Sequence, residues 1–496
     1  MNDVPKDRIE DAGSPGRRPL RAAVIGAGMA GILAAVKLRE RNIDLAVFEK
    51  ADSVGGTWRD NTYPGLACDV AAHWYTYSFA RNPDWDRLMA AGPDIRAYFE
   101  RVAAERGVLP LIRFGDEVTR LEYDAAGWQL TTAAGYRDRF DIVIVATGVL
   151  HHPNIPQFEG LETFEGAVFH SARWDHDVPL DGKRIGVVGT GSTAAQLTSA
   201  LAPRSAHFSL FQRTPQWVMP RPNPEYSPEE KAAFRADPAA LEALVQQLRS
   251  KTLEGYATAV LDYDSPQLAE IERLCREHLE TVRDPDLRRR LTPDYRAACK
   301  RLVISDDFYR AIQHPNAELV TSPIVRIEPA GIRTADGTLH ELDVLALATG
   351  FLVDRFIRPA KVIGRGGLDL DDVWAEVPSA YLSVTVPGFP NLFMLNGPNS
   401  PVGNFSLIEV SERQVGYLMQ LIDGVQRGDY REVSATPEAL DRFEAERQEA
   451  AKRTVWVTGC NSWYLDKRGV PSSWTFSFDR FAQEMTAPKM ADFETR

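Results

Sequence analysis

Two glycine-rich turns of the kind that binds a dinucleotide constrain this chain of 496 residues more than any other feature. The first reads Gly26-Ala27-Gly28-Met29-Ala30-Gly31 and the second reads Gly189-Thr190-Gly191-Ser192-Thr193-Ala194. Glycine permits a tight turn and a close approach to a pyrophosphate, and the helix that follows presents its N-terminal amides to that group. A chain that builds two such sites usually passes electrons from one dinucleotide to the other. The two turns therefore predict a flavoenzyme that is reduced by a nicotinamide nucleotide.

The first turn lies in a complete strand–helix–strand pattern. Apolar runs predict buried strands over residues 22–25 and 45–48, and residues 32–38 predict the helix between them. The second strand ends at Glu49, 21 residues after Gly28, where such folds place the carboxylate that binds the ribose hydroxyls. The nucleotide ligands predicted from this pattern are Gly26, Gly28, Gly31 and Glu49.

Two segments that follow Glu49 offer further candidates at the first site. Gly55-Gly56-Thr57-Trp58 can extend the phosphate and flavin cradle through Gly56, Thr57 and Trp58, or it can be a simple glycine turn. Asp69 stands in the turn-rich segment 63–69, where a carboxylate can orient an arginine or hold the flavin environment. On the residues alone, Asp69 can equally be an aspartate that caps a turn.

The second turn also lies in a strand–helix–strand pattern, but a basic residue follows its second strand where the first unit has the acidic Glu49. Residues 184–188 predict a strand, 194–201 a helix and 207–211 the next strand, which Gln212-Arg213-Thr214 follows. A guanidinium can pair with a 2′-phosphate that a carboxylate would repel, so NADPH is favoured over NADH. The alternative is that Arg213 is a plain surface arginine. The ligands predicted here are Gly189, Gly191, Ser192, Thr193, Arg213 and Thr214.

The predicted fold is α/β, with two Rossmann-like dinucleotide-binding domains, for FAD and NADPH, and a helical insertion. The insertion is predicted from the charged, helix-like composition that begins at about residue 224, and a further helix is predicted over about 406–422. The predicted division is 1–18, a flexible N-terminal tail; 19–150, the first segment of the FAD-binding domain; 151–223, the first segment of the NADPH-binding domain; 224–298, the helical insertion; 299–345, the second segment of the NADPH-binding domain; and 346–496, the second segment of the FAD-binding domain with a C-terminal substrate-side region.

Composition and charge argue against several other classes of protein. The net charge of −12 is spread along the chain, and we interpret the basic cluster Arg288-Arg289-Arg290 as a solvated helix face, so no nucleic-acid partner is predicted. The most apolar stretch, residues 22–38, contains three glycines and Lys37, and therefore predicts no membrane span. The histidines lack the context of metal ligands, and no metal site is predicted.

The four cysteines bear on the cellular compartment. They lie far apart and include no Cys-x-x-Cys pair, which argues against a disulfide scaffold, a zinc site and a disulfide reductase. Their spacing favours a reducing, cytoplasmic location. They are Cys68, Cys275, Cys299 and Cys460.

An aromatic–histidine string between the two turns carries a family resemblance. Phe164, Gly166, His170, Trp174 and Asp175 match the pattern Phe-x-Gly-x-x-x-His-x-x-x-Trp-(Pro/Asp). The chain thereby resembles the type I Baeyer–Villiger monooxygenases of the flavin-containing monooxygenase superfamily, from about residue 20 to about residue 475. Related enzymes that oxidise soft nitrogen and sulfur atoms usually end the string in Tyr or Phe, so the ending Trp-Asp favours the Baeyer–Villiger branch.

The resemblance implies an activity and its cofactors. It implies an FAD that NADPH reduces and that reacts with O₂ to give a C4a-peroxyflavin, which inserts one oxygen atom into a ketone to form an ester or lactone. A small-molecule ketone and O₂ are therefore the implied partners, and the oligomeric state is left open. Two other hypotheses also remain open. The same fold could oxygenate sulfur or nitrogen, or the chain could be a redox sensor that retains its nucleotides without turnover.

The resemblance also implies a catalytic pair. Arg301 matches the arginine of the family's active-site basic pair, Lys300-Arg301, and Asp69 matches the carboxylate that holds this arginine in place. A peroxyanion in a water-poor site needs a fixed cation, and arginine stays protonated where a lysine can lose its proton.

Further contacts to NADPH follow from the same resemblance. Arg213 and Thr214 resemble the family's contacts to the phosphate of NADPH, Lys300 offers an additional contact, and Trp463 resembles a tryptophan that touches bound NADP⁺. His170 is expected to be a structural or domain-coupling residue. The segment 464–469 departs from the best-known cyclohexanone-oxidising enzymes, so the resemblance does not imply a specific ketone.

Overall fold

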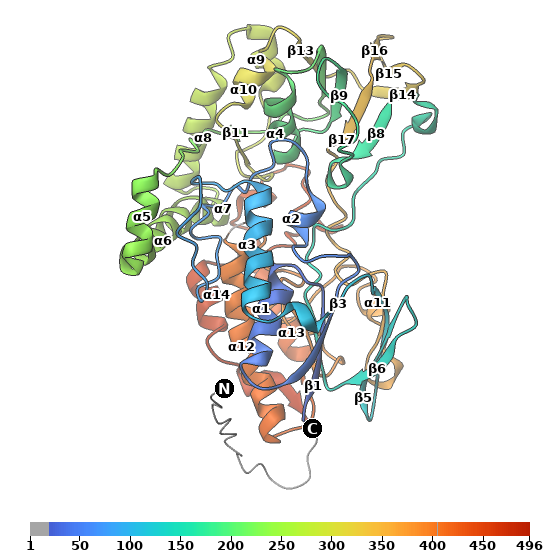
Figure 1. Ribbon diagram of the computed structural model, residues 1–496, viewed down its shortest axis with the longest axis vertical. Helices are drawn as coiled ribbons and strands as arrows, with labels where there is room; N and C mark the ends of the chain where they lie inside the picture. The colour runs from blue at the N-terminus through green and yellow to red at the C-terminus, as the bar shows by residue number, and fades with distance from the viewer. Residues whose placement is uncertain (1–18, 404) are drawn as a thin grey trace, which may run out of the picture.

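Two parallel sheets, each built around one glycine turn, form the framework of the protein (Figure 1). The computed structural model describes residues 19–403 and 405–496, so the predicted tail 1–18 lies outside the described residues. The beginning and the end of the chain, blue and red in Figure 1, form one half of the molecule, and the green and yellow middle of the chain forms the other half. The predicted α/β fold with two Rossmann-like units is confirmed.

The first sheet has the strand order β19-β7-β1-β2-β3, and all of its strand pairs are parallel. Its central strand is an unbroken apolar run because alternate residues enter two different cores. Ala22 and Val24 pack with the helices, whereas Ala23 and Ile25 pack with a mixed sheet. The strands are β1 (Arg21–Ile25), β2 (Asp44–Phe48), β3 (Ile112–Arg113), β7 (Ile142–Val145) and β19 (Leu392–Met394).

Helices cover one face of the first sheet and the mixed sheet β18-β4-β5-β6, in which β4, β5 and β6 are antiparallel, covers the other. α1 (Met29–Arg39) connects β1 to β2 and packs against α12 (Leu407–Arg427), which comes from the C-terminal region. The C-terminal region therefore returns to the first sheet. The other elements of this half are α2 (Thr57–Asp60), α3 (Gly92–Glu105), β4 (Val118–Asp124), β5 (Gly127–Thr132), β6 (Arg137–Phe140), β18 (Lys361–Ile363), α11 (Leu370–Val373), β20 (Val433–Ala435), α13 (Pro437–Ala451), α14 (Phe478–Glu484) and β21 (Phe493–Thr495).

The second sheet repeats this design with the strand order β13-β10-β9-β17-β8, and its pairs are again all parallel. Its strand β17 pairs with β9 as far as Leu347, so the strand crosses the domain boundary that the sequence placed at residue 345. The elements are β8 (Ala167–His170), β9 (Arg184–Val188), α4 (Ser192–Leu201), β10 (His207–Phe211), α10 (Phe308–Ile312), β13 (Ala317–Val320), β14 (Ile324–Glu328), β15 (Gly331–Thr334), β16 (Leu339–Glu341) and β17 (Val344–Leu347).

A group of helices projects from the second half between residues 228 and 291 (Figure 1). Four of these helices begin with a proline directly after a capping side chain, since proline at the first helical position gives up no hydrogen bond. The caps are Ser227, Asp237, Ser265 and Asp284. The elements are β11 (Val218–Met219), α5 (Pro228–Ala236), α6 (Pro238–Thr252), a π-helical turn (Leu253–Ala257), α7 (Thr258–Leu261), α8 (Pro266–Leu279), α9 (Pro285–Leu291) and β12 (Val303–Ile304).

The helices of the described chain do not have the character of membrane spans. In residues 19–403 and 405–496, no helix has both the length and the apolar character needed to cross a membrane. α12 illustrates the reason, because its 21 residues include Glu409, Glu412 and Asp423.

Candidate active site

One cavity of about 1900 Å³ lies between the two sheets and includes both glycine turns. The carboxyl ends of the strands open into it, as they do at ligand sites in open α/β sheets, and Ile25, Phe48, Val188 and Phe211 form part of its wall. A pocket for one drug-sized ligand typically measures roughly 300–1,000 Å³, so this cavity has room for more than one. The predicted site residues that line it are Gly26, Gly28, Glu49, Gly56, Thr57, Trp58, Asp69, Gly189, Gly191, Ser192, Thr193, Arg213, Thr214, Lys300, Arg301 and Trp463.

Gly31 does not line the cavity but makes the first turn possible. A Cβ atom on Gly31 would lie 1.8 Å from the carbonyl oxygen of Gly26, so only glycine lets α1 approach the turn this closely. Gly26 itself has a φ of +101°, in the region that side chains rarely adopt. These two residues therefore shape the loop that Gly28 presents to the cavity.

Glu49 is buried at the end of β2 and is held by three groups. Its carboxylate accepts hydrogen bonds from the backbone N–H groups of Ala27 (2.7 Å) and Ala51 (3.0 Å). It also forms an ion pair of 3.1 Å with Arg59, whose side chain is only 9% exposed. Arg59 was not predicted from the sequence, although a charged residue directly after the Gly-Gly-Thr-Trp run was a signal for it.

Three helices direct their N-termini at the cavity. α1, α4 and α12 each place residues of the first turn or the preceding loop in its wall. The unpaired amide groups at a helix N-terminus attract anions, and the first turns of α1 and α4 contain no acidic residue that would cancel this effect. Near α12, the buried Oδ1 atom of Asn396 has no hydrogen-bond partner among the described residues. The chemistry of this wall fits the phosphates and polar ring edge of a flavin dinucleotide.

The second glycine turn closely approaches the backbone that follows β17. Gly189 has a φ of +129°, and a Cβ atom there would lie 2.3 Å from the carbonyl oxygen of Ala348. Thr190 fixes the far side of the turn by donating a hydrogen bond of 2.8 Å to the carbonyl of Thr214. Gly191, in contrast, faces open space and leaves the N-terminus of α4 accessible from the cavity.

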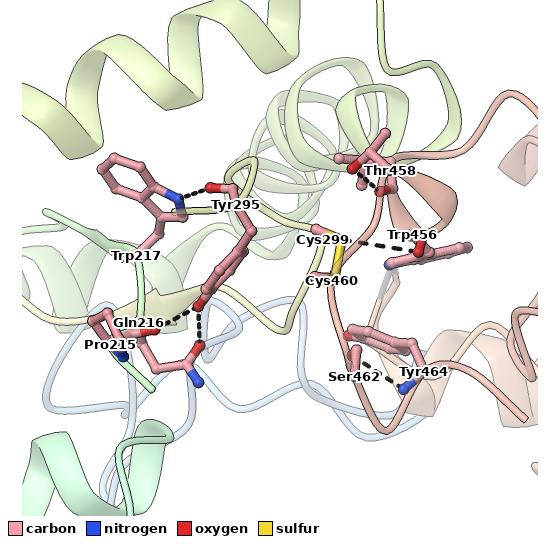
Figure 2. Close-up of a disulfide and its surroundings, with 11 residues drawn as sticks. Pro215, Gln216, Trp217, Tyr295, Cys299, Trp456, Thr458, Cys460, Ser462 and Tyr464 are labelled. Atoms are coloured by element: carbon pink, nitrogen blue, oxygen red, sulfur yellow. Dashed lines mark hydrogen bonds between the residues drawn. A yellow bond between two sulfur atoms is a disulfide. The ribbon is translucent and has the colours of Figure 1, made fainter. Parts of the chain in front are cut away.

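Arg213 and Lys300 form a positively charged corner of the cavity. The pKa of Lys300 is lowered by burial and by the charge of Arg213. Tyr295 links the segment after Arg213 to the segment that carries Lys300. Its hydroxyl donates a hydrogen bond of 2.7 Å to the carbonyl of Pro215 (Figure 2). The Nζ atom of Lys300 lies 4.7 Å from the centroid of the Tyr295 ring. Among the described residues, neither cation has a carboxylate within ion-pair distance. This corner fits the 2′-phosphate of NADPH.

Arg301 and Asp69 meet in the middle of the cavity wall. The Nη2 atom of Arg301 lies 2.6 Å from the Oδ2 atom of Asp69. The carboxylate of Asp69 raises the pKa of Arg301 well above its usual value, with smaller contributions from Tyr464 and Tyr256, so the guanidinium stays charged. The expected pairing of these two residues is therefore present in the structure.

Gly403 and Tyr464 complete the surroundings of Arg301, and neither role was predicted from the sequence. A Cβ atom on Gly403 would lie 2.2 Å from the hydroxyl oxygen of Tyr464 and 2.8 Å from the Nη1 atom of Arg301. The Tyr464 side chain is fully buried, whereas its neighbour Trp463 is 40% exposed and stacks on it with ring centroids 4.1 Å apart. No local sequence pattern marks either contact.

Known proteins resemble the chain over almost its full length. The family described as flavin-binding monooxygenase-like matches residues 20–254. An uncharacterized monooxygenase of Mycobacterium tuberculosis is 48% identical over 465 residues, which cover 93% of each chain. A Baeyer–Villiger monooxygenase of Streptomyces coelicolor is 39% identical over 96% of this chain and 92% of that one. The chain belongs to the flavin-binding monooxygenase-like family.

The same relationship is evident in three dimensions. The crystal structure of a cyclohexanone monooxygenase from Rhodococcus, bound to NADP⁺, aligns with a TM-score of 0.86 at 31% identity. The alignment covers 97% of this chain and all of that one. The resemblance inferred from the aromatic–histidine string is confirmed, and the protein is a flavoprotein monooxygenase.

The aromatic–histidine string of this monooxygenase lies beside the cavity and outside its wall. His170, at the end of β8, is buried, and its Nε2 atom lies 3.0 Å from the carbonyl of Gly350, at the crossover out of the second sheet. Gly166 allows β8 to approach Asp343, since a Cβ atom there would lie 2.5 Å from its carbonyl oxygen. Phe164 and Trp174 are buried, and Asp175 accepts a backbone hydrogen bond within its own turn. These contacts hold β8 and the segment after it in place, and no residue of the string lines the cavity.

The cysteine spacing argued against a disulfide scaffold, and the structure nevertheless contains one disulfide. Cys299 and Cys460 are disulfide-bonded, with Cα atoms 6.1 Å apart, whereas Cys68 and Cys275 are free and buried. The two bonded residues are 161 positions apart in the chain, and only the packing of the second half against the C-terminal segment brings them together. Spacing in the sequence carried no signal of this contact.

Proposed function

We propose that this monooxygenase binds FAD at the first glycine turn and NADPH at the second, and inserts one oxygen atom of O₂ into ketones to give esters or lactones. The observation that carries the proposal is the Arg301–Asp69 ion pair, which lies in the cavity shared by both turns. The Baeyer–Villiger monooxygenase and the NADP⁺-bound cyclohexanone monooxygenase to which the chain is similar support it.

The two glycine turns and the basic corner of the cavity would bind the two nucleotides. Gly26, Gly28 and the N-terminus of α1 would hold the pyrophosphate of FAD, which supplies the redox chemistry once it is bound and reduced. Arg213 and Lys300 would hold the 2′-phosphate of NADPH by charge-assisted hydrogen bonds.

Arg301 acts at the reacting atoms. A fixed cation in a partly buried site stabilises the negative charge that develops on oxygen during the transfer, and it does so without reorganisation. Asp69 holds the guanidinium in one orientation and keeps it protonated. The proposal therefore assigns Arg301 to catalysis and Asp69 to positioning.

The test measures flavin reduction by NADPH and oxygen transfer to the substrate as two separate steps. Purified protein reconstituted with FAD is reduced anaerobically with NADPH, which should bleach the flavin, and is then mixed with ¹⁸O₂ and a panel of ketones. Mass spectrometry should show esters or lactones that contain one ¹⁸O atom. A panel of thioethers and amines, run in parallel, measures the competing reaction. Sulfoxide formation without any ester would reassign the enzyme to sulfur oxygenation, and a protein that binds no FAD would end the proposal.

A further inference from the structure

The disulfide joins two segments that line the site. Cys299 directly precedes Lys300 and Arg301, and Cys460 lies three residues before Trp463. Figure 2 shows the bond between these segments, with Trp456, Ser462 and Tyr464 on the Cys460 side. The Sγ atom of Cys299 also lies 3.8 Å from the carbonyl oxygen of Trp456.

Neither segment is held in place by regular secondary structure. Residues 292–302 connect α9 to β12 and residues 458–477 lead into α14, and both runs are irregular. The described backbone groups form no hydrogen bond between residues 299–302 and residues 458–465. The two segments otherwise meet through side chains, since Cys299 and Leu302 share a buried apolar core with Trp456 and Tyr464. The Tyr464 hydroxyl and Arg301 also pack around Gly403. The disulfide is thus the covalent link between two walls of the site that are joined by side-chain packing and by no backbone hydrogen bond among the described residues.

We propose that Cys299 and Cys460 are positioning residues of the monooxygenase, whose disulfide holds Arg301 against Tyr464 and Trp463 and so makes oxygen transfer depend on the oxidation state of this pair. The proposal rests on the proposed function for its effect on turnover. The part of the proposal that concerns structure, namely that the disulfide tethers the two segments and that reduction releases them, depends only on the observed bond.

The exchange between the two states is balanced. A hydroperoxide such as H₂O₂ oxidises one thiol to a sulfenic acid and releases water, and the second thiol then displaces a second water to form the disulfide. Two electrons pass from the two thiols to the peroxide. A dithiol reverses the reaction through a mixed disulfide, and its own two sulfurs become a disulfide.

The other two cysteines provide an internal contrast. All four cysteines are buried, but Cys68 and Cys275 form no disulfide, and burial raises the pKa of both thiols to about 12. Cys275 lies within α8, inside the core of the second half, and does not line the cavity. Cys275→Ala is therefore the matched control for removal of one sulfur.

The experiment compares the FAD-loaded wild type, Cys460→Ala and Cys275→Ala, each after treatment with dithiothreitol or H₂O₂. Alkylation of the denatured protein should find two free thiols in the oxidised wild type and four in the reduced one. Hydrogen exchange of residues 458–473 should be faster in reduced wild type and in Cys460→Ala under both treatments. The amount of ester formed per NADPH consumed should fall roughly tenfold in the same samples, because a displacement of about 1 Å can cost up to ~100-fold in rate.

The rate of flavin reduction by NADPH shows whether a variant has lost its fold or only the position of Arg301. At saturating NADPH we expect this rate to change less than about twofold in every sample, since the tether holds Lys300 and Arg301 and leaves the glycine turns intact. A displaced Lys300 raises the KM for NADPH instead. Cys275→Ala should respond to both reagents as the wild type does. Four free thiols after H₂O₂ treatment, or identical hydrogen exchange in both states, would overturn the tether. If no sample made an ester but exchange still followed the thiol state, the proposed function would fail and the tether would stand.

Discussion

Arg301 and Asp69 form an ion pair of 2.6 Å although 232 residues separate them in the chain. Asp69 follows the first sheet's glycine cradle, and Arg301 follows the helical group of the second half. A second link reinforces the contact, because the hydroxyl of Tyr63 donates a hydrogen bond of 2.8 Å to Gln196 of α4. This ion pair therefore forms only where the two halves of the molecule are packed together.

Replacement of Arg301 should separate the two half-reactions. We expect Arg301→Ala to leave anaerobic flavin reduction by NADPH within about threefold of the wild type and to lower ester formation by about 100-fold or more, the range seen when one charge-stabilising group is removed. Stopped-flow absorbance and product analysis measure the two steps. Arg310→Ala, on an arginine whose side chain is 84% exposed, is the control. Ester formation at the wild-type rate in Arg301→Ala would remove the role assigned to this residue.

Arg213 should decide which nicotinamide nucleotide is used. Removal of a charged partner of a phosphate costs about 1.5–3 kcal/mol, so Arg213→Ala should raise the KM for NADPH by about 10- to 150-fold. The KM for NADH should change little, because NADH has no 2′-phosphate. Steady-state kinetics with both nucleotides test this, and Lys300→Ala should shift the values in the same direction. An equal rise for both nucleotides would place Arg213 elsewhere on the cofactor.

One glycine from each nucleotide-binding turn, Gly31 and Gly191, should respond differently to replacement by alanine. Gly31→Ala forces a Cβ atom to within 1.8 Å of the Gly26 carbonyl and should lower the free energy of unfolding by about 1–3 kcal/mol and weaken FAD retention. Gly191→Ala meets no atom within 4 Å and has an ordinary φ of −74°, so the free energy of unfolding should hold or rise slightly. Urea unfolding of the apoprotein measures both. A stable, FAD-loaded Gly31→Ala would contradict the packing argument.

His73 should make the protein sensitive to mild acid. It is buried against Tyr226 and Phe234, and burial, with the nearby charge of Arg81, lowers its pKa to about 4. The unfolded chain, with a histidine pKa of about 6.5, then binds more protons than the folded protein between about pH 6.5 and pH 4. The free energy of unfolding should therefore fall as the pH drops through this window, with a contribution from His73 of about 2 kcal/mol at about pH 5.

Replacement of this histidine tests the assignment. His73→Phe keeps an aromatic ring in the same place and cannot bind a proton, so urea unfolding at pH 7 and pH 5 should show a smaller loss than in the wild type. The pKa of His151 is also lowered to about 4 by burial, and some pH dependence should therefore remain. A pH profile identical to that of the wild type would show that His73 is already protonated or exposed in the folded protein.

Local sequence was enough to predict both glycine turns and the strands that lead into them, because each feature is a run of consecutive residues. The same holds for the residue after the second strand of each unit, which is the acidic Glu49 in the first unit and lies in the run Gln212-Arg213-Thr214 in the second. A buried parallel strand needs an unbroken apolar run, and the structure shows why: Ala22 and Ala23 enter different cores. The helix predicted over about 406–422 begins one residue later, at Leu407 of α12, and extends to Arg427. The ends of elements depend on neighbouring packing, which local periodicity does not report.

The chain's local patterns determined the fold class, the two nucleotide sites and the charge that each presents, because turn geometry and strand burial act over a few neighbouring residues. Only the tertiary structure decided which distant residues meet: the Cys299–Cys460 bond and the packing of Tyr464 and Arg301 around Gly403. These contacts depend on the relative placement of two sheets and an irregular C-terminal segment. That placement is set by the burial of whole surfaces, so no short stretch of sequence encodes it.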